Sequence, residues 1–170
     1  MKSIITPWNP KKSDFTLVAL LKNCSKKKDL HKGTQIHEDI VKSKNDGLLQ
    51  KNPYVASALI NMYAKCGKLA KAHEVHDLLH VRRTVSWNAL ISGYVEHGQP
   101  HRAFDSFEQM QGEGLSPDLV TYICMLKACG KVEAINKGKE IHEDIVRKGM
   151  LKRNIVLGTA LVDMYAKCDK

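Results

Sequence analysis

Residues 58–66 read Ala-Leu-Ile-Asn-Met-Tyr-Ala-Lys-Cys, and residues 160–168, 102 positions later, read Ala-Leu-Val-Asp-Met-Tyr-Ala-Lys-Cys. A second pair of similar segments lies 105 positions apart, at residues 22–41 and 127–146. Two nearly equal offsets indicate a higher-order unit that recurs with a small change of length in one loop. The chain is therefore predicted to be a repeat protein.

The long period divides into shorter units, because residues 84–118 form a third variant of the same pattern. Units of 31 to 39 residues have the size of a helix-turn-helix repeat. We place an N-terminal extension, four repeats and a truncated repeat at residues 1–13, 14–52, 53–83, 84–118, 119–154 and 155–170, respectively.

Each unit reads as two helices. In residues 84–118, two apolar stripes have helical spacing. They consist of Val85, Leu90, Ile91 and Tyr94, and of Ala103, Phe104, Phe107 and Met110. Gly98 and Pro100 lie between the stripes, as expected for a helix end followed by a helix start. Gly67 and Gly130 are expected to separate the helices of two other units. The predicted fold is all-α, an α-solenoid of stacked, tetratricopeptide-like helix-turn-helix repeats.

The last unit contains only one helix before the sequence stops at Lys170. That helix is expected to expose an apolar side that includes Leu161 and Met164. A solenoid normally ends in a polar cap. We therefore expect a gene fragment, a truncated product, or a protein that self-associates through this uncapped repeat.

The net charge is +9 and the pI is about 9.3. Lysines are spread along the chain, which favours an extended polyanionic partner over a point site. No apolar run approaches the ~18 residues of a membrane span.

The odd number of cysteines, without a C-x-x-C pair or a signal peptide, predicts free, packed thiols in a reducing compartment. These are Cys24, Cys66, Cys124, Cys129 and Cys168.

Three segments closely resemble the plant pentatricopeptide repeat (PPR) family: residues 85–91 (Val-Ser-Trp-Asn-Ala-Leu-Ile), 61–67 (Asn-Met-Tyr-Ala-Lys-Cys-Gly) and 114–118 (Gly-Leu-Ser-Pro-Asp). The alternating unit lengths are similar to the PLS subclass of that family, in the order L, S, P, L and a truncated S. The resemblance covers residues 14–170. In the family, C-to-U editing belongs to a C-terminal E/DYW extension, which is not expected here, so a deaminase would act in trans.

The resemblance implies binding of single-stranded RNA at about one base per repeat. The family specifies the base chiefly with the fifth and last residues of a repeat. Asn88 and Asp118 match a pair that favours uridine. The other residues carried over to these positions are Ser57, Arg83, Asn154, Asn52 and Thr159. Val18 and Ile123 occupy two of the fifth positions and cannot hydrogen-bond a base.

Two further sets of positions follow from the resemblance. The second residue of each repeat is an apolar position that clamps the base: Phe15, Tyr54, Val85, Val120 and Val156. A lysine late in the first helix contacts phosphate: Lys26, Lys65, Lys131 and Lys167. Glu96 occupies this position in the P-like repeat, where the positive track is expected to be weaker.

Other chemistry is poorly supported. His73, His76 and His80 have helical spacing, but without a fourth ligand we interpret them as a polar helix face rather than a metal site. His37 and His142 each precede Glu-Asp, and their recurrence favours solvated helix surface over acid–base catalysis. No nucleophile elbow, phosphate loop or deaminase metal signature is present. We predict a non-enzymatic protein that needs no cofactor.

The predicted function is recognition of single-stranded RNA in organellar RNA editing or processing, in the mitochondrion or chloroplast. The process and the organelle rest on the resemblance, and the sequence has no clear transit peptide. Other PPR proteins or editing factors are possible partners in trans, and a membrane is not. The alternatives are a protein-binding helical scaffold and a non-functional gene fragment.

Overall fold

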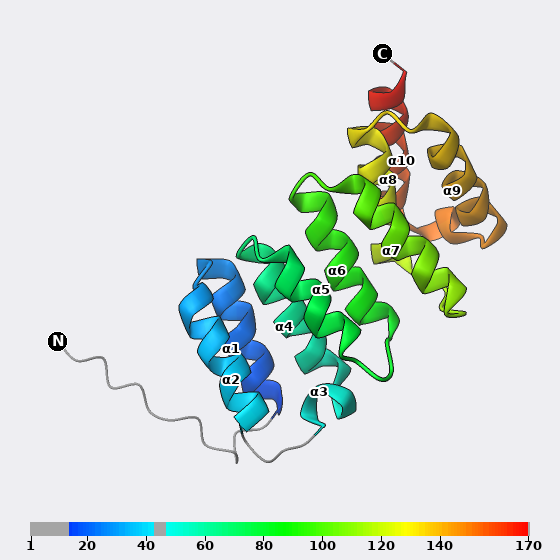
Figure 1. Ribbon diagram of the computed structural model, residues 1–170. Coiled ribbons are helices and arrows are strands. Elements are labelled where there is room, and N and C mark those ends of the chain that lie inside the picture. The colour runs from blue at the N-terminus through cyan, green and yellow to red at the C-terminus, as the bar shows by residue number, and fades with distance from the viewer. Residues whose placement is uncertain (1–13, 43–46, 170) are drawn as a thin grey trace. The chain divides into compact units, whose positions relative to one another are not determined.

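The computed structural model describes residues 14–42 and 47–169, apart from the side chain of Arg153 (Figure 1). The proposed N-terminal extension at residues 1–13 lies outside this range. Within the described range all regular structure is helical, as the sequence predicted. The chain divides into two compact units, residues 1–82 and 83–170.

The first unit contains α1 (Asp14–Lys27), α2 (Leu30–Lys42), α3 (Leu48–Lys51), α4 (Pro53–Lys65) and α5 (Leu69–Asp77). The leading helices α1 and α4 pack against each other, and α2 and α5 each pack against a leading helix. The core between them is aliphatic, with Leu17, Leu21, Leu59 and Met62 fully buried.

The second unit contains α6 (Thr84–Glu96), α7 (Pro100–Gly112), α8 (Leu119–Lys131), α9 (Ile135–Arg147), η1 (Met150–Arg153) and α10 (Ile155–Cys168). The leading helix α8 packs between α6 and α10, whereas α7 and α9 flank this row. Trp87 and Tyr122 occupy the fourth position of their repeats, and both are buried. The repeats thus stack through their leading helices within this unit.

Local sequence explains where the helices begin. The side chains of Asn52, Asp118 and Asn154 accept hydrogen bonds from backbone N–H groups in the first turns of α4, α8 and α10. Such caps satisfy donors that a helix leaves without an internal partner. Proline at the first position of α4 and α7 costs no helical hydrogen bond.

The sequence predicted that Gly130 separates two helices, and this prediction was wrong. It is a buried residue inside α8, and the chain turns only at Glu133, whose φ is 53°. A Cβ atom on Gly130 would lie 3.1 Å from Cδ of Lys167 and 3.6 Å from Cα of Met164. This glycine therefore permits close packing of α8 and α10. Gly67, by contrast, follows α4 with a φ of 74°, as expected for a helix end.

The prediction for the last helix was also wrong in detail. Leu161 and Met164 are buried, because their side of α10 packs against α8 and α9. The exposed apolar residues of α10 are instead Ile155, Val156 and Val162.

The five cysteines are free thiols, and Cys24, Cys124 and Cys129 are buried, as predicted. Burial raises the pKa of Cys129 to about 12. A thiol with such a pKa is a packing group and a poor nucleophile at neutral pH.

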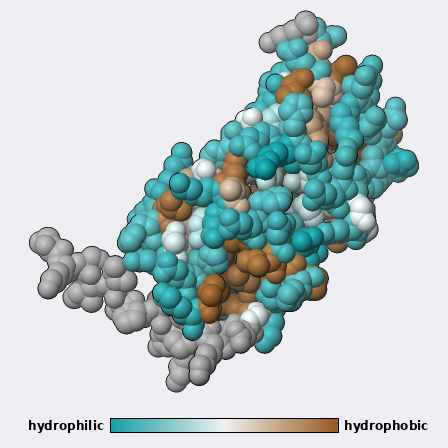
Figure 2. Space-filling view, in the orientation of Figure 1, coloured by the Kyte–Doolittle hydropathy of each residue, from teal (hydrophilic) through white to brown (hydrophobic). Residues whose placement is uncertain are grey.

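The face seen in Figure 2 is mostly hydrophilic, with a hydrophobic area near α3. A hollow of about 310 Å³ beside α3 is lined by Ile40, Val41, Leu48 and Leu49, together with polar neighbours. Among the residues described, no helix is long and apolar enough to cross a bilayer.

Candidate nucleic-acid interface

Apolar side chains protrude near the start of every leading helix. The second residue of each repeat is exposed to solvent by between 36% and 86% of its surface. These residues are Phe15, Tyr54, Val85, Val120 and Val156. Their exposure shows that the fold does not use them as core, so they are available for contact with a flat apolar surface such as a base.

The lysines predicted to contact phosphate follow these apolar residues at a constant spacing. Tyr54 and Lys65, like Val120 and Lys131, are 11 positions apart on one helix. Eleven residues make about three turns and a rise of roughly 16 Å, so both side chains lie on the same helix face. Each leading helix, except the one that carries Glu96, therefore presents an apolar group and a cation along one stripe.

The four lysines differ in their surroundings. Lys26, Lys131 and Lys167 are exposed, whereas Lys65 is partly buried. The ammonium of Lys131 donates to the carbonyl of Val95 at the end of α6. Lys167 donates to Asp163 of its own helix at 2.6 Å. An exposed ion pair such as that of Lys167 and Asp163 contributes little to stability.

Asn88 in α6, Asp118 before α8 and Thr121 in the first turn of α8 form one hydrogen-bond network. Asn88 Nδ2 donates to the two Asp118 carboxylate oxygens, at 2.9 and 3.1 Å. Thr121 Oγ1 lies 2.7 Å from Asn88 Oδ1 and 3.0 Å from Asp118 Oδ1. The fifth and last residues of repeat 84–118 are thus in direct contact.

This network fixes which way the Asn88 amide points. A carboxylate only accepts hydrogen bonds, so the amide nitrogen faces Asp118 and the amide oxygen faces the Thr121 hydroxyl. Asn88 is 8% exposed and Thr121 is fully buried. One N–H can contact both carboxylate oxygens, which leaves the second N–H and one oxygen lone pair of Asn88 for a ligand.

The other proposed base-specifying positions lack such a network. Ser57 Oγ donates to the Tyr54 carbonyl at 3.1 Å, and the Arg83 side chain is exposed at the start of α6. Val18 and Ile123 are partly buried aliphatic residues. Asn52 donates to Asp14 at 2.9 Å. Asn52 is also held from two sides, because its Oδ1 accepts from Tyr54 N and Val55 N. Asn88 differs in that both of its partners, Asp118 and Thr121, are side chains.

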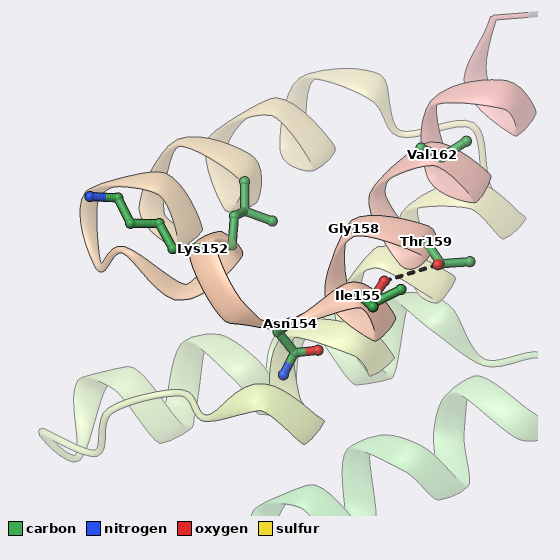
Figure 3. A pocket seen from close by; sticks show the side chains of 7 residues that line it. Lys152, Asn154, Ile155, Gly158, Thr159 and Val162 are labelled. Carbon is green, nitrogen blue, oxygen red and sulfur yellow. Dashed lines mark hydrogen bonds between the residues drawn. The ribbon is translucent and has the colours of Figure 1, made fainter.

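Thr159 and Asn154 both line an open hollow of about 660 Å³ beside α10 (Figure 3). The Thr159 hydroxyl donates to the Ile155 carbonyl at 2.9 Å, and Asn154 Oδ1 accepts from Leu157 N at 3.1 Å. Both groups are thus engaged with their own helix, and Val162 adds an apolar wall.

Sequence reasoning missed that the last residue of a repeat also caps the next leading helix. Asn52, Asp118 and Asn154 all have this second role. The preference for Asn and Asp immediately before a helix was a usable signal. Thr121 was missed as well, because its contact with Asn88 joins residues 33 positions apart.

Of the three histidines predicted to form a polar helix face, only His73 is partly exposed on α5. His76 is buried rather than on a polar face, and His80 lies beyond the end of α5. His37 Nδ1 lies 2.9 Å from the Tyr63 hydroxyl, and His142 Nδ1 lies 2.9 Å from that of Tyr165. Both rings are partly buried rather than fully solvated, because each joins a second helix to the following leading helix.

A charged cluster links α8 to α9. Asp144 accepts hydrogen bonds from the Tyr122 hydroxyl and from Arg147, and it pairs with Lys148 at 3.3 Å. Burial opposes the charge of Asp144, but these donors outweigh it and lower its pKa to about 2. Burial, reinforced by Asp144, raises the pKa of Tyr122. The cluster fastens two helices of one repeat.

Family models match much of the chain. The model described as the PPR repeat family matches residues 82–131, and that described as the PPR repeat matches residues 54–83 and 120–150. The match at residues 82–131 includes all three residues of the Asn88 network.

Curated proteins of Arabidopsis thaliana are similar over nearly the whole chain. A pentatricopeptide repeat-containing protein is 37% identical over 93% of this chain and 22% of its own length. A mitochondrial one is 39% identical over 91% of this chain and 15% of its length. A chloroplastic one is 34% identical over 93% and 25%, respectively. The chain thus spans about a fifth of the length of these relatives.

Two solved structures share the fold. The pentatricopeptide repeat protein PPR10 from maize aligns with a TM-score of 0.70 and 23% identity, over 95% of this chain and 23% of that one. The PPR domain of Arabidopsis thaliana protein-only RNase P 1, solved in complex with tRNA, aligns with a TM-score of 0.59 and 19% identity, over 92% and 85%. The predicted α-solenoid fold is confirmed.

Proposed function

Because the chain belongs to the PPR repeat family, we propose that it is a single-stranded RNA-binding module with a preference for uridine at one position. The observation that carries this proposal is the contact between Asn88 and Asp118. An amide held by a carboxylate offers a donor next to an acceptor, which complements O4 and N3–H of uracil. A scaffold that bound peptides would not require this arrangement.

Affinity would come mainly from the stripes on the leading helices. Exposed apolar residues such as Tyr54 and Val120 stack on bases, and lysines such as Lys65 and Lys131 neutralise phosphates. Four full repeats correspond to roughly four nucleotides at one base each. Binding is therefore expected to be weak, with a log–log salt slope of roughly −0.7 for each phosphate contact.

We further propose that the module serves organellar RNA editing or processing and that its repeats follow the PLS pattern. Mitochondrial and chloroplastic proteins both occur among its relatives, which supports an organellar location. The repeats would then supply recognition, and another polypeptide segment or protein would supply the chemistry.

Self-association through α10 is a second proposal. Ile155 and Val162 are exposed beside the hollow that α10 borders, so a second copy could bury them there. Sedimentation equilibrium tests this: wild type should form dimers that Val162→Glu abolishes. A wild type that is monomeric at all concentrations would contradict it.

Selection of a randomised RNA pool on the purified chain tests RNA recognition. Wild type should enrich uridine at one position, and Asn88→Ala should lose that enrichment while it still binds RNA. Asn61→Ala is a matched control, because it makes the same change on the leading helix α4 at a position without a proposed role in RNA binding, and it should keep the uridine. Failure to retain any RNA at low salt, or the same uridine enriched by Asn88→Ala, would refute the proposal.

A further inference from the structure

We infer that Thr121, a buried residue of the following repeat, is a positioning residue that makes Asn88 discriminate uridine from cytidine. This inference rests on the proposed function, because it concerns how the same site distinguishes two bases. Thr121 does not touch the base in this account. It acts through the amide of Asn88, whose oxygen lies 2.7 Å from the threonine hydroxyl.

Uracil and cytosine differ in the hydrogen-bonding groups on their base edges. Uracil presents an O4 acceptor beside an N3–H donor, whereas cytosine presents an N4–H donor beside an N3 acceptor. An amide that rotates by 180° exchanges its donor and acceptor and can therefore serve either base. A side chain amide selects uracil only if its orientation is held.

Two groups hold the Asn88 amide. The two carboxylate oxygens of Asp118 accept from Asn88 Nδ2, at 2.9 and 3.1 Å. Thr121 donates to the amide oxygen and also accepts from Asp118 N at 3.1 Å. The hydroxyl therefore joins the Asn88 amide to the backbone of Asp118, in a site where Thr121 is fully buried.

Loss of this hydroxyl should reduce selectivity more than affinity. In Thr121→Val the volume is retained, but the buried oxygen of Asn88 loses its donor. The amide is then held by Asp118 alone, so the orientation that suits cytosine costs less than in the wild type. One hydrogen bond corresponds to a change of about three- to tenfold in the preference for uridine over cytidine. Contacts with phosphates and with the stacked base remain in place.

Ser86 provides a matched control. It occupies the third position of repeat 84–118, as Thr121 does in repeat 119–154. Its Oγ donates to the Arg83 carbonyl at 2.9 Å and accepts from Arg83 N at 3.2 Å. Ser86→Ala thus disturbs the start of α6 as Thr121→Val disturbs that of α8, without removing a donor to a base-specifying amide.

The experiment compares dissociation constants for the selected RNA and for the same RNA with cytidine in place of the enriched uridine. Thr121→Val should lower the ratio of the dissociation constant for the cytidine RNA to that for the uridine RNA three- to tenfold. Thr121→Ser and Ser86→Ala should keep the wild-type ratio. Circular dichroism melts check folding. If Thr121→Val does not fold, Thr121→Cys replaces it, because cysteine keeps the volume with a weaker donor. Its ratio of dissociation constants should then be lower than that of the wild type.

An unchanged ratio in Thr121→Val, alongside a lost uridine preference in Asn88→Ala, would overturn this inference alone. A wild type without any uridine preference, or an Asn88→Ala variant that retains it, would overturn the proposed function and the inference with it.

Discussion

A Cβ atom on Gly138 in α9 would lie 2.5 Å from the Sδ of Met164 in α10. The same overlap would occur between Gly33 in α2 and Met62 in α4. Both methionines are fully buried. The recurring Lys-Gly of the second helices is thus explained by the methionine of the next leading helix, whose thioether fills the space beside the glycine.

Substitution of Gly138 by alanine should destabilise the protein by about 1–2 kcal/mol, because overpacking outweighs the better helix propensity of alanine. In a Met164→Ala background the same change should be neutral or stabilising, by up to about 1 kcal/mol. Denaturant unfolding of the four variants measures this coupling.

Gly158→Ala is the control, since nothing lies within 4 Å of its Cβ position. It should stabilise α10 by about 0.5–1 kcal/mol. A Gly138→Ala variant that gained as much stability as Gly158→Ala would contradict the packing account.

Charge reversal on the leading helices should weaken RNA binding. Lys65→Glu with Lys131→Glu is expected to lower affinity at least tenfold at low salt and to reduce the salt slope by about 1.4. The matched pair Lys42→Glu with Lys139→Glu lies on second helices and changes the net charge equally. Equal losses in the two pairs, measured by fluorescence anisotropy, would show that only net charge matters.

Truncation of the exposed apolar residues tests stacking. Val120→Ala on α8 should lower RNA affinity about two- to fivefold without a loss of stability, since an aliphatic contact with a base is weaker than the ~1–3 kcal/mol of aromatic stacking. Val146→Ala on α9 removes the same atoms from a residue of similar exposure and should leave affinity unchanged. Filter binding and thermal melts separate the two effects, and an equal drop in affinity for both variants would count against a leading-helix surface.

The Asp144 cluster should stabilise the fold at neutral pH and lose this contribution at low pH. Its pKa of about 2 lies below the ordinary 3.8, so its contribution is complete above about pH 4 and is lost as the pH falls from 4 to 2. Asp144→Asn should cost about 1–2 kcal/mol at pH 7 and flatten this acid limb. Melting temperatures from pH 2 to 7 measure this contribution. Parallel curves for wild type and Asp144→Asn would show that Asp144 does not cause the loss of stability in acid.

Much of the fold was predictable because the signals are local. Apolar stripes, Pro53 and Pro100 mark where helices lie, and repeated segments imply stacking. Gly130 was misassigned because a glycine that provides close packing and one that ends a helix look alike in sequence. Met164 was misplaced because burial depends on which face of α10 meets α8.

The candidate site was predictable only in part. The resemblance to PPR repeats pointed to Asn88 and Asp118, but the role of Thr121 depends on how α8 starts beside α6. His37 and His142 looked like surface residues, because their partners, Tyr63 and Tyr165, lie 26 and 23 positions away. Contacts between successive repeats require the stacking geometry itself.

Photo-crosslinking to RNA that carries 4-thiouridine, followed by peptide mapping, shows which helices contact the RNA. We expect crosslinks on the leading helices α1, α4, α6, α8 and α10, near Tyr54 and Val120 in particular. Crosslinks confined to the second helices α2, α5, α7 and α9, or no crosslinks at low salt, would contradict this expectation.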